Sequence, residues 1–367
     1  MKQTIVLKLQ PSDDQRQMLL DTMTAFNAAV QCVANVAFEQ HTASKIKLQK
    51  LLYYRLREEF GLSSQMAVRA IGKATEAYKR DKDIYCTFDP LGAMVYDERI
   101  LNFRLTEVSI LTLSGRQMIP YRFGAYQAAR LDRIKGQADL IYRGGQFYLH
   151  VTVDMPESDP VETVGFLGID LGIVEIATDS EGNSYSGEQV KAVRRKLKRQ
   201  RALLQSAGTK SAKKHLKRIA RKQSRFVRNT NHIISKQLVQ TALDSAKILV
   251  FENLQGIRDR ANDYGREMRW LIGNWAFNQL RTFATYKATM AGLPVMLIDP
   301  RNTSRECSAC GFISKANRTS QSHFKCLQCG HDDNADKNAA KVIAVRGALS
   351  AALLLQTSPG LATSPPI

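Results

Sequence analysis

The sequence contains no apolar run close to the ~20 residues that a helix needs to span a bilayer. Its longest such stretch, residues 348–355, is far shorter. The N-terminal residues MKQTIVLKLQ alternate polar and apolar side chains and lack the apolar core of a secretion signal. We therefore expect a cytoplasmic protein with no membrane partner.

Cysteine is scarce as well, with six among 367 residues. Because disulfides are rare in cytoplasmic proteins, the six cysteines need another explanation. Cys32 and Cys86 stand alone, which is typical of small buried side chains. The other four lie together near the C-terminal end of the chain.

Acidic residues are missing from one long stretch of the chain. No Asp or Glu occurs between Glu188 and Asp244, where basic residues are dense. The whole chain has 53 Lys and Arg against 34 Asp and Glu, a net charge of +19. Leucines at roughly helical spacing predict a basic helical hairpin that turns at residues 206–208. Such a one-sided surface repels itself unless phosphates neutralise it, and a merely solvated face is the alternative.

This charge balance favours nucleic acid as a partner. Aromatic side chains are rare in the stretch, so we expect it to follow a phosphate backbone without reading bases. The candidate contacts are Arg194, Arg195, Lys198, Arg199, Lys213, Lys214, Lys217, Arg218, Arg221, Lys222 and Arg225.

Changes in hydrophobic periodicity predict a multidomain α+β protein. An N-terminal strand and later alternating runs favour a small antiparallel β-barrel into which a helical bundle is inserted. Strands that alternate with helices then indicate an α/β domain interrupted by a cysteine-rich segment. The predicted parts are a barrel at 1–10 and 83–160, a bundle at 11–82, an α/β domain at 161–302 and 333–348, a cysteine-rich insertion at 303–332 and a disordered tail at 349–367.

Three carboxylates stand at the ends of predicted elements in the α/β domain. Asp170 ends the apolar strand FLGI, Glu252 ends the strand KILVF, and Asp336 lies at the start of a helix. A strand that ends in Asp and is followed by a hairpin is typical of the beginning of an RNase H-like domain. Taken singly, each acid has a structural alternative as a turn former or helix cap.

The three acids together suit phosphodiester hydrolysis. Two Mg²⁺ ions, roughly 3.5–4 Å apart, can activate a water and stabilise the departing oxygen, and Mg²⁺ prefers carboxylate oxygens as ligands. We expect Asp170 to bridge both ions, with Glu252 and Asp336 each completing one.

The four clustered cysteines form two pairs, Cys307-x-x-Cys310 and Cys326-x-x-Cys329, separated by 15 residues. This spacing predicts one structural Zn²⁺ site with four thiolate ligands. A glycine follows each pair and allows the tight turn that brings backbone N–H groups to sulfur. The ribbon either contacts nucleic acid or serves only as a structural staple.

Aromatic residues recur at helical spacing further along the α/β domain, at Trp275, Phe277, Phe283 and Tyr286. This spacing favours packing in the core, with base stacking as the alternative.

Several motifs together resemble one known family. FLGIDLGI, LVFENLQGIR, WAFNQLRTFATYKATMAGLPVMLIDPRNTS, CSACG, CLQCG and DKNAA are similar to motifs of the TnpB proteins. TnpB proteins are transposon-encoded, RNA-guided DNA endonucleases related to type V CRISPR effectors. The match is dense from about residue 165 to residue 345, whereas the N-terminal half matches only in its general layout.

The resemblance implies that Asp170, Glu252 and Asp336 form a RuvC-type catalytic triad and that the four cysteines form the family's zinc ribbon. It implies a wedge barrel with a recognition bundle, a guide RNA from the transposon end, and double-stranded target DNA beside a short adjacent motif. It also implies a prokaryotic, nucleoid-associated protein, and we expect a monomer with its RNA.

Two alternatives stay open at this point. The chain is either an unguided RNase H-like nuclease or transposase, or a non-enzymatic zinc-ribbon regulator that binds nucleic acid. The three acids argue against the regulator, because a protein that only binds has no need of them.

Overall fold

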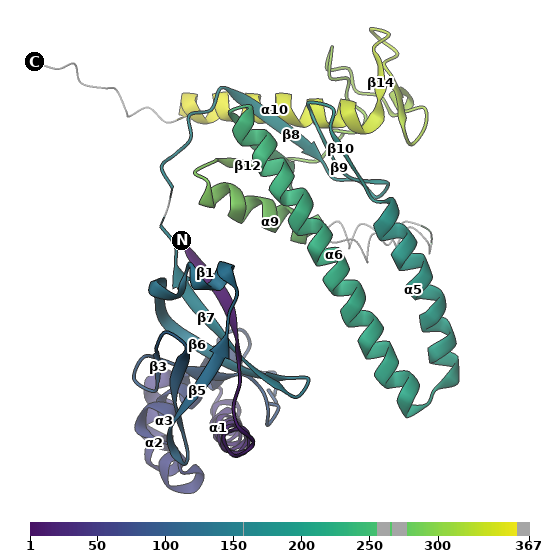
Figure 1. The fold of residues 1–367 in the computed structure, drawn as a ribbon. Helices are drawn as coiled ribbons and strands as arrows, with labels where there is room; N and C mark the ends of the chain where they lie inside the picture. Colours follow the sequence, from purple (N-terminus) through teal and green to yellow (C-terminus); the bar gives the residue numbers. More distant parts are fainter. Residues whose placement is uncertain (157, 255–264, 266–276, 358–367) are drawn as a thin grey trace, which may run out of the picture. The chain divides into compact units, whose positions relative to one another are not determined.

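A computed structural model describes residues 1–156, 158–254, 265 and 277–357. The chain forms two compact units, Met1–Pro156 and Glu157–Ile367 (Figure 1). Within the described residues, no helix is long and apolar enough to cross a membrane.

The first unit contains an antiparallel sheet of seven strands. β1 (Lys2–Leu9) lies between β7 (Gln146–Asp154) and β5 (Gly115–Arg122), so the N-terminal strand joins strands that follow more than 90 residues later. The remaining strands are β2 (Met94–Tyr96), β3 (Leu101–Phe103), β4 (Glu107–Thr112) and β6 (Ile134–Arg143).

The two edges of this sheet approach one another. The order β2-β6-β7-β1-β5-β4-β3 puts β2 and β3 at opposite edges, although residues 97–100 alone separate them in the chain. The Tyr96 hydroxyl on β2 also donates to the Leu111 carbonyl on β4 at 3.0 Å. The sheet is therefore a nearly closed barrel, as the sequence predicts.

Three helices stand between β1 and β2 in the chain. They are α1 (Asp13–Glu39), α2 (Lys45–Phe60) and α3 (Ser64–Tyr78), and a short helix, α4 (Ala125–Ala128), follows β5. Ser12 caps α1 by accepting from the Gln15 backbone N–H, while the Gln15 side chain accepts from the Ser12 N–H.

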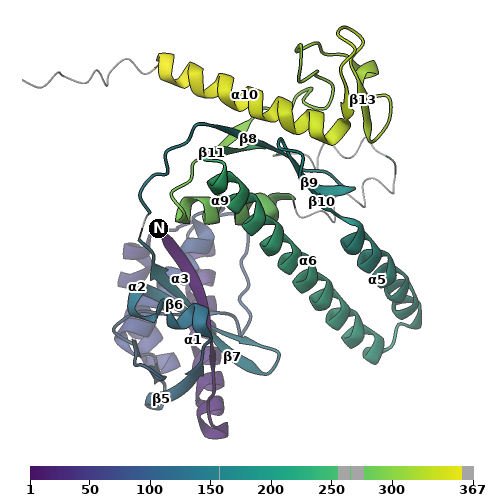
Figure 2. The ribbon, with the colours of Figure 1, turned by 45° about the horizontal axis from the view of Figure 1, so that its top comes forward.

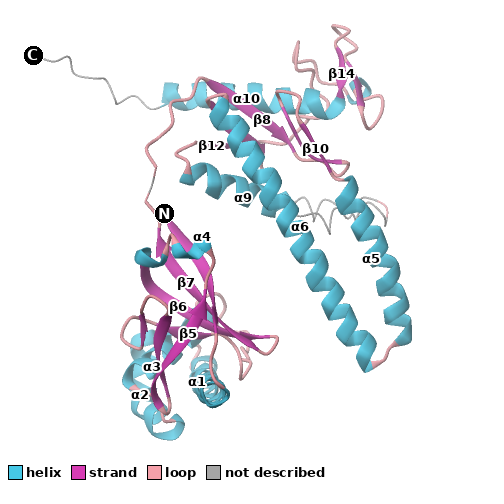
Figure 3. Ribbon diagram, in the orientation of Figure 1, coloured by secondary structure: helices cyan, strands magenta, loops and turns pink. Residues whose placement is uncertain are grey.

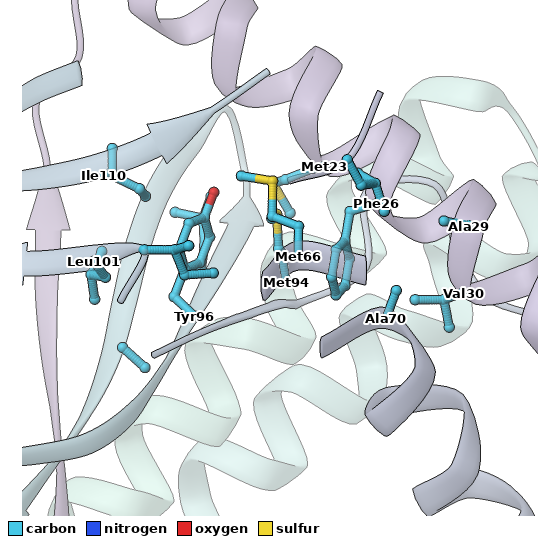
Figure 4. Packing of buried hydrophobic residues seen from close by; sticks show 14 of the residues in the cluster. Met23, Phe26, Ala29, Val30, Met66, Ala70, Met94, Tyr96, Leu101 and Ile110 are labelled. Atoms are coloured by element: carbon cyan, nitrogen blue, oxygen red, sulfur yellow. The ribbon is translucent and has the colours of Figure 1, made fainter. Parts of the chain in front are cut away.

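The helices and the sheet of the first unit share one hydrophobic core (Figure 4). Met23 and Phe26 of α1, Met66 of α3, and Met94 and Tyr96 of β2 are all buried in it. Burial of side chains this large stabilises each by about 1.5–3 kcal/mol. Helices and barrel therefore fold as one compact unit and do not form separate cores.

The second unit is built on a five-stranded mixed sheet with the order β10-β9-β8-β11-β12. β8, β9 and β10 are antiparallel, whereas β11 is parallel to both β8 and β12. The strands are β8 (Gly165–Asp170), β9 (Glu175–Asp179), β10 (Ser184–Ser186), β11 (Lys247–Glu252) and β12 (Val295–Ile298). The predicted strand–hairpin–strand–strand order of the α/β domain is confirmed.

Helices cover both faces of this sheet (Figures 1 and 2). α6 (Lys210–Asp244) and α9 (Phe277–Met290) pack on the face that carries Leu167, Ile169 and Phe251. α10 (Ala335–Thr357) packs on the other face.

α5 (Glu188–Ala207) pairs with α6 as a long helical hairpin. Gly208 caps α5 in a left-handed conformation and Thr209 caps α6, so the predicted hairpin is present and its turn lies at residues 208–209, one residue later than the end of α5. Figure 3 shows this hairpin extending away from the sheet of its unit.

The cysteine-rich segment stands between β12 and α10. It contains a two-stranded sheet, β13 (His323–Lys325) and β14 (Asp332–Asn334), and a short 3-10 turn, Lys315–Asn317.

Two predicted boundaries need correction. Residues 349–357, predicted as disordered tail, continue α10, because Ala and Leu favour helix and the turn-forming Ser-Pro-Gly follows only at 358–360. The first unit ends at Pro156, before the predicted boundary at residue 160. Ser158 and Val161 donate hydrogen bonds to Met290 and Gly292, which attaches this segment to the second unit. Residues 358–367 lie outside the described part of the chain.

Candidate active site, zinc centre and nucleic-acid interface

Asp170 and Glu252 end two neighbouring parallel strands. Ile169 of β8 and Phe251 of β11 are partners in the register, so the two acids follow at the same carboxyl edge of the sheet. Ligand sites of open α/β sheets lie at such edges. Side chains alternate along a strand, and Ile169 and Phe251 are buried against α6 and α9. Asp170 and Glu252 therefore project on the opposite face, which α10 covers.

α10 approaches β8 closely enough to bring Asp336 to the same place. A Cβ on Gly168 would lie 2.1 Å from the Ala340 carbonyl oxygen and 2.4 Å from the Ala344 nitrogen. Further along the helix, a Cβ on Gly347 would lie 3.4 Å from the Phe166 ring, so α10 runs antiparallel to β8. Asp336 is one turn before Ala340, about 6 Å along the helix, and Asp170 is two residues after Gly168, about 7 Å along the strand. The two acids therefore lie near one another, and their charges interact.

We expect Gly168→Ala to destabilise the second unit and to disturb this proximity of the acids. Overpacking of a core costs about 1–3 kcal/mol, and both clashing atoms are backbone atoms that cannot rotate away. Thermal melting and the rate of cleavage should both fall. Gly165→Ala is the matched control, since its Cβ would meet only the flexible Lys247 side chain at 3.5 Å. Equal melting of both variants would contradict the close packing.

The environment of the three acids opposes negative charge. Burial raises the pKa of Asp170 well above its usual value, and the charges of Glu252 and Asp336 raise it further. Burial likewise raises the pKa of Glu252 and of Asp336. The Arg318 guanidinium acts against this rise at Asp170 and Asp336. A cluster of this kind gains most from a bound cation, which would neutralise it.

Two side chains of the cysteine-rich segment contact these acids. The Arg318 guanidinium pairs with Asp336 at 3.3 Å, and the buried Thr303 hydroxyl donates to the Glu252 carboxylate. In the sequence, Arg318 appears only as one basic residue on the ribbon surface, and no motif marks Thr303. The local pattern carries no signal for such contacts, because the partners are 18 and 51 residues apart in the chain.

The donor set suits Mg²⁺, since it consists of hard carboxylate oxygens whose ionised forms Arg318 and Thr303 compensate only in part, because the net pKa shift of each acid is upward. The ligand atoms of the three acids are not as tightly gathered as those of the cysteines. Among the residues described, the four cysteines are the group of possible metal ligands whose atoms all lie within 4.8 Å of one another. Asp299, which directly follows β12, forms a turn by accepting from the Arg301 N–H at 3.0 Å.

The four cysteine sulfurs are arranged for a tetrahedral ion. The Sγ atoms of Cys307 and Cys329 are 3.6 Å apart, as are those of Cys310 and Cys326. Zn–S bonds of about 2.3 Å at tetrahedral angles require a separation of about 3.8 Å. The backbone N–H of Cys329 lowers the pKa of the Cys326 thiol to about 6, which favours the thiolate that binds metal. The predicted convergence of the four residues is confirmed, and they fit Zn²⁺.

The turns around these cysteines have the predicted conformation. Gly311 and Gly330 have φ angles of 76° and 75°, which glycine adopts without strain. Their N–H groups donate to the carbonyls of Cys307 and Cys326 at 2.8 and 3.1 Å.

The cysteine-rich segment is fastened to α10 through buried polar contacts. Asn338 accepts from the Ser308 N–H at 3.0 Å and donates to the Glu306 carbonyl at 2.8 Å. Arg346 pairs with the Glu306 carboxylate. Since Asp336 is two residues from Asn338, the first cysteine pair and this acid are supported by the same helical turn.

The basic hairpin presents all but one of its predicted contacts to solvent. Arg195, Lys198 and Arg199 on α5 and the seven candidates on α6 are exposed. Arg194 is the exception: it is only 8% exposed, and burial lowers the pKa of its guanidinium. Arg194 lies on the face of α5 that also buries Val190 and Leu197, so it is less accessible to a phosphate than the other ten residues.

The aromatic residues near α9 divide between two environments. Phe277 is buried with Leu280 in the core, which confirms core packing there. Phe283 is half-buried and stacks on His232 of α6, with ring centroids 3.9 Å apart. Trp275 lies outside the described residues.

Two family models match the second half of the chain. A model described as a probable transposase matches residues 149–248. A model described as the Cas12f1-like TNB domain matches residues 277–343, which include the four cysteines and Asp336.

Curated relatives carry names of the same kind. A CRISPR-associated endodeoxyribonuclease Cas12f1 from Sulfoacidibacillus thermotolerans is 30% identical over 221 residues, covering 55% of this chain and 51% of that protein. A putative RNA-guided DNA endonuclease InsQ from Escherichia coli is 26% identical over 220 residues, covering 55% and 54%. A TnpB-like protein from Methanocaldococcus jannaschii is 33% identical over 108 residues, covering 29% and 38%.

The chain is similar to TnpB-like and Cas12f proteins over these segments. The alignments span about half the length, or less, of these curated relatives. The fold extends the likeness to both units. A Cas12f1 structure solved with guide RNA and target DNA superposes with a TM-score of 0.65 at 15% identity, covering 89% of this chain and 83% of that one.

Proposed function

We propose that this TnpB relative is an RNA-guided, Mg²⁺-dependent DNA endonuclease with a RuvC-type, RNase H-like catalytic domain. The observation that supports the proposal is the proximity of Asp170 to both Glu252 and Asp336, whose charges act on it at one edge of the sheet. In each case a strand end or helix start presents the acid. The mixed sheet, with its antiparallel hairpin and two parallel strands, supports the RNase H-like assignment.

In this proposal Asp170, Glu252 and Asp336 would supply the carboxylate ligands of the metal ions. When bound, two Mg²⁺ ions would activate the attacking water and stabilise the departing oxygen of the phosphodiester. The protein holds the three carboxylates close together and half-buried or buried, which keeps bulk water from competing for the ligands. Arg318 offers a cation beside Asp336 that can also attract a scissile phosphate.

The basic hairpin is proposed to hold the guide RNA or its heteroduplex by the phosphate backbone. Its ten exposed cations line two adjoining helices that have no carboxylate between residues 188 and 244. Sequence selection would then rest on base pairing by the RNA, with the protein recognising backbone geometry. This division of labour favours guided cleavage of double-stranded DNA over the unguided nuclease. We further propose that the protein acts as a monomer with its RNA in the prokaryotic cytoplasm.

The proposal is tested by expressing the protein with its native flanking DNA and sequencing the RNA that survives nuclease treatment of the purified complex. We expect one defined RNA whose end derives from sequence beside the gene. With that RNA, matched double-stranded DNA should be cut in Mg²⁺ and left intact in EDTA. Recovery of only random host RNA would contradict guided cleavage and favour indiscriminate binding of polyanions by a +19 chain.

A further inference from the structure

Glu252 is buried and has few means of holding its orientation. It is 8% exposed, and its side chain has more rotatable bonds than that of either partner acid. Among the residues described, the Thr303 hydroxyl is the hydrogen-bond donor on its carboxylate. Asp336, in contrast, pairs with an arginine.

From this arrangement we propose that Thr303 is a positioning residue, whose hydroxyl orients Glu252 so that the carboxylate can bind a divalent cation. The inference rests on the proposed metal site. Thr303 is 4% exposed and follows β12 by five residues. Its β-branched side chain restricts χ1, so the position of the backbone determines where the hydroxyl points.

The loop that carries Thr303 is tightly held. The Arg346 guanidinium of α10 donates to the carbonyls of Asp299 and Arg301 at 3.1 and 2.7 Å. Downstream of Thr303, the same guanidinium pairs with Glu306. Arg346 and Asp336 both belong to α10. The same helix therefore holds the loop whose Thr303 contacts Glu252 and sets the position of Asp336.

The two partners of this hydrogen bond differ in how many alternatives they have. The Thr303 hydroxyl can also donate to the Pro300 carbonyl at 3.1 Å, so it has a second acceptor within reach. Glu252 has no second donor within the described residues. Removal of the hydroxyl should therefore disturb Glu252 more than the loop.

The test compares Mn²⁺ binding, followed by electron paramagnetic resonance, in full-length wild-type protein, Thr303→Val and Thr303→Ser. Loss of a group that orients a metal ligand weakens metal binding by roughly 10–100-fold. We expect Thr303→Val to weaken Mn²⁺ binding by at least about tenfold on this basis, and Thr303→Ser to restore most of the affinity. The Mg²⁺ concentration for half-maximal cleavage should rise in the valine variant, while saturating Mg²⁺ recovers most of the rate.

Two further variants make the result decisive. Thr75→Val is the matched control, since its buried hydroxyl donates only to the Gly72 carbonyl at 2.8 Å, and it should bind Mn²⁺ like wild type. Asp170→Asn removes one proposed ligand of the metal site and should abolish the electron paramagnetic resonance signal of bound Mn²⁺. If Asp170→Asn loses Mn²⁺ but Thr303→Val does not, the role of Thr303 is overturned and the metal site stands. If Asp170→Asn keeps Mn²⁺, the metal site falls and the role of Thr303 falls with it.

Discussion

Asp170→Asn should lower DNA cleavage by at least about a thousandfold while guide RNA and DNA still bind. Loss of a ligand shared by two ions removes several kcal/mol of transition-state stabilisation, and about 4 kcal/mol corresponds to a thousandfold in rate. The substitution leaves the exposed cations of the basic hairpin unchanged, so binding measured by gel shift should persist. Cleavage at the wild-type rate would show that the acids are not the catalytic site.

The same variant should be more stable than the metal-free wild type near neutral pH. The pKa of Asp170 is raised in the folded protein, so the folded state takes up protons more readily than the unfolded state between the unfolded and folded pKa values. Folding stability therefore falls as the pH rises through this window, and the full penalty acts above the folded pKa. Asn mimics the neutral carboxyl and escapes that penalty.

Thermal melting in EDTA as a function of pH measures this effect. The advantage of Asp170→Asn should be present at high pH and vanish below the unfolded pKa of an aspartate, about 3.9. Asp13→Asn is the control, since Asp13 is exposed in the first turn of α1. A melting curve for Asp170→Asn below that of wild type at every pH would mean that Asp170 stabilises the fold.

Cys307→Ser should remove zinc and unfold the ribbon. Structural Zn²⁺ sites contribute about 10–16 kcal/mol of apparent binding free energy to small ribbons, and the first cysteine pair is fastened to the helix that carries Asp336. We therefore expect zinc content to fall from one ion per chain to none, and cleavage to fall with it.

Metal analysis and proteolysis check this expectation. New cleavage by protease within residues 303–332 should accompany the loss of zinc. Cys86→Ser is the matched control, because Cys86 belongs to the first unit and lies outside the cluster. Unchanged zinc in Cys307→Ser would overturn the four-cysteine site.

Much of the site could be read from local sequence because its residues stand at the ends of regular elements. Apolar runs marked β8 and β11, and an acid ended each run. The cysteine spacing likewise marked two tight turns, whose glycines have the expected positive φ angles. These features depend on neighbours a few residues apart.

The burial of Arg194 could not be predicted, because periodicity does not say which face of α5 other elements cover. One turn of helix separates Val190 from Arg194, so both lie on the buried side. The charge of a residue alone does not say whether it lies on the buried or the exposed side of the helix.

The sequence by itself determined the type of each main element, the order of strands and helices, and the residue classes able to bind Mg²⁺ and Zn²⁺. Periodicity and turn chemistry depend on residues close together in the chain, so these features can be predicted without the tertiary structure. Three contacts could be known only from the tertiary structure. The missing side chain of Gly168 allows α10 to pack closely on β8, Arg318 pairs with Asp336, and the Thr303 hydroxyl donates a hydrogen bond to Glu252. Those contacts join residues far apart in the chain, and they arise from how helices and strands pack.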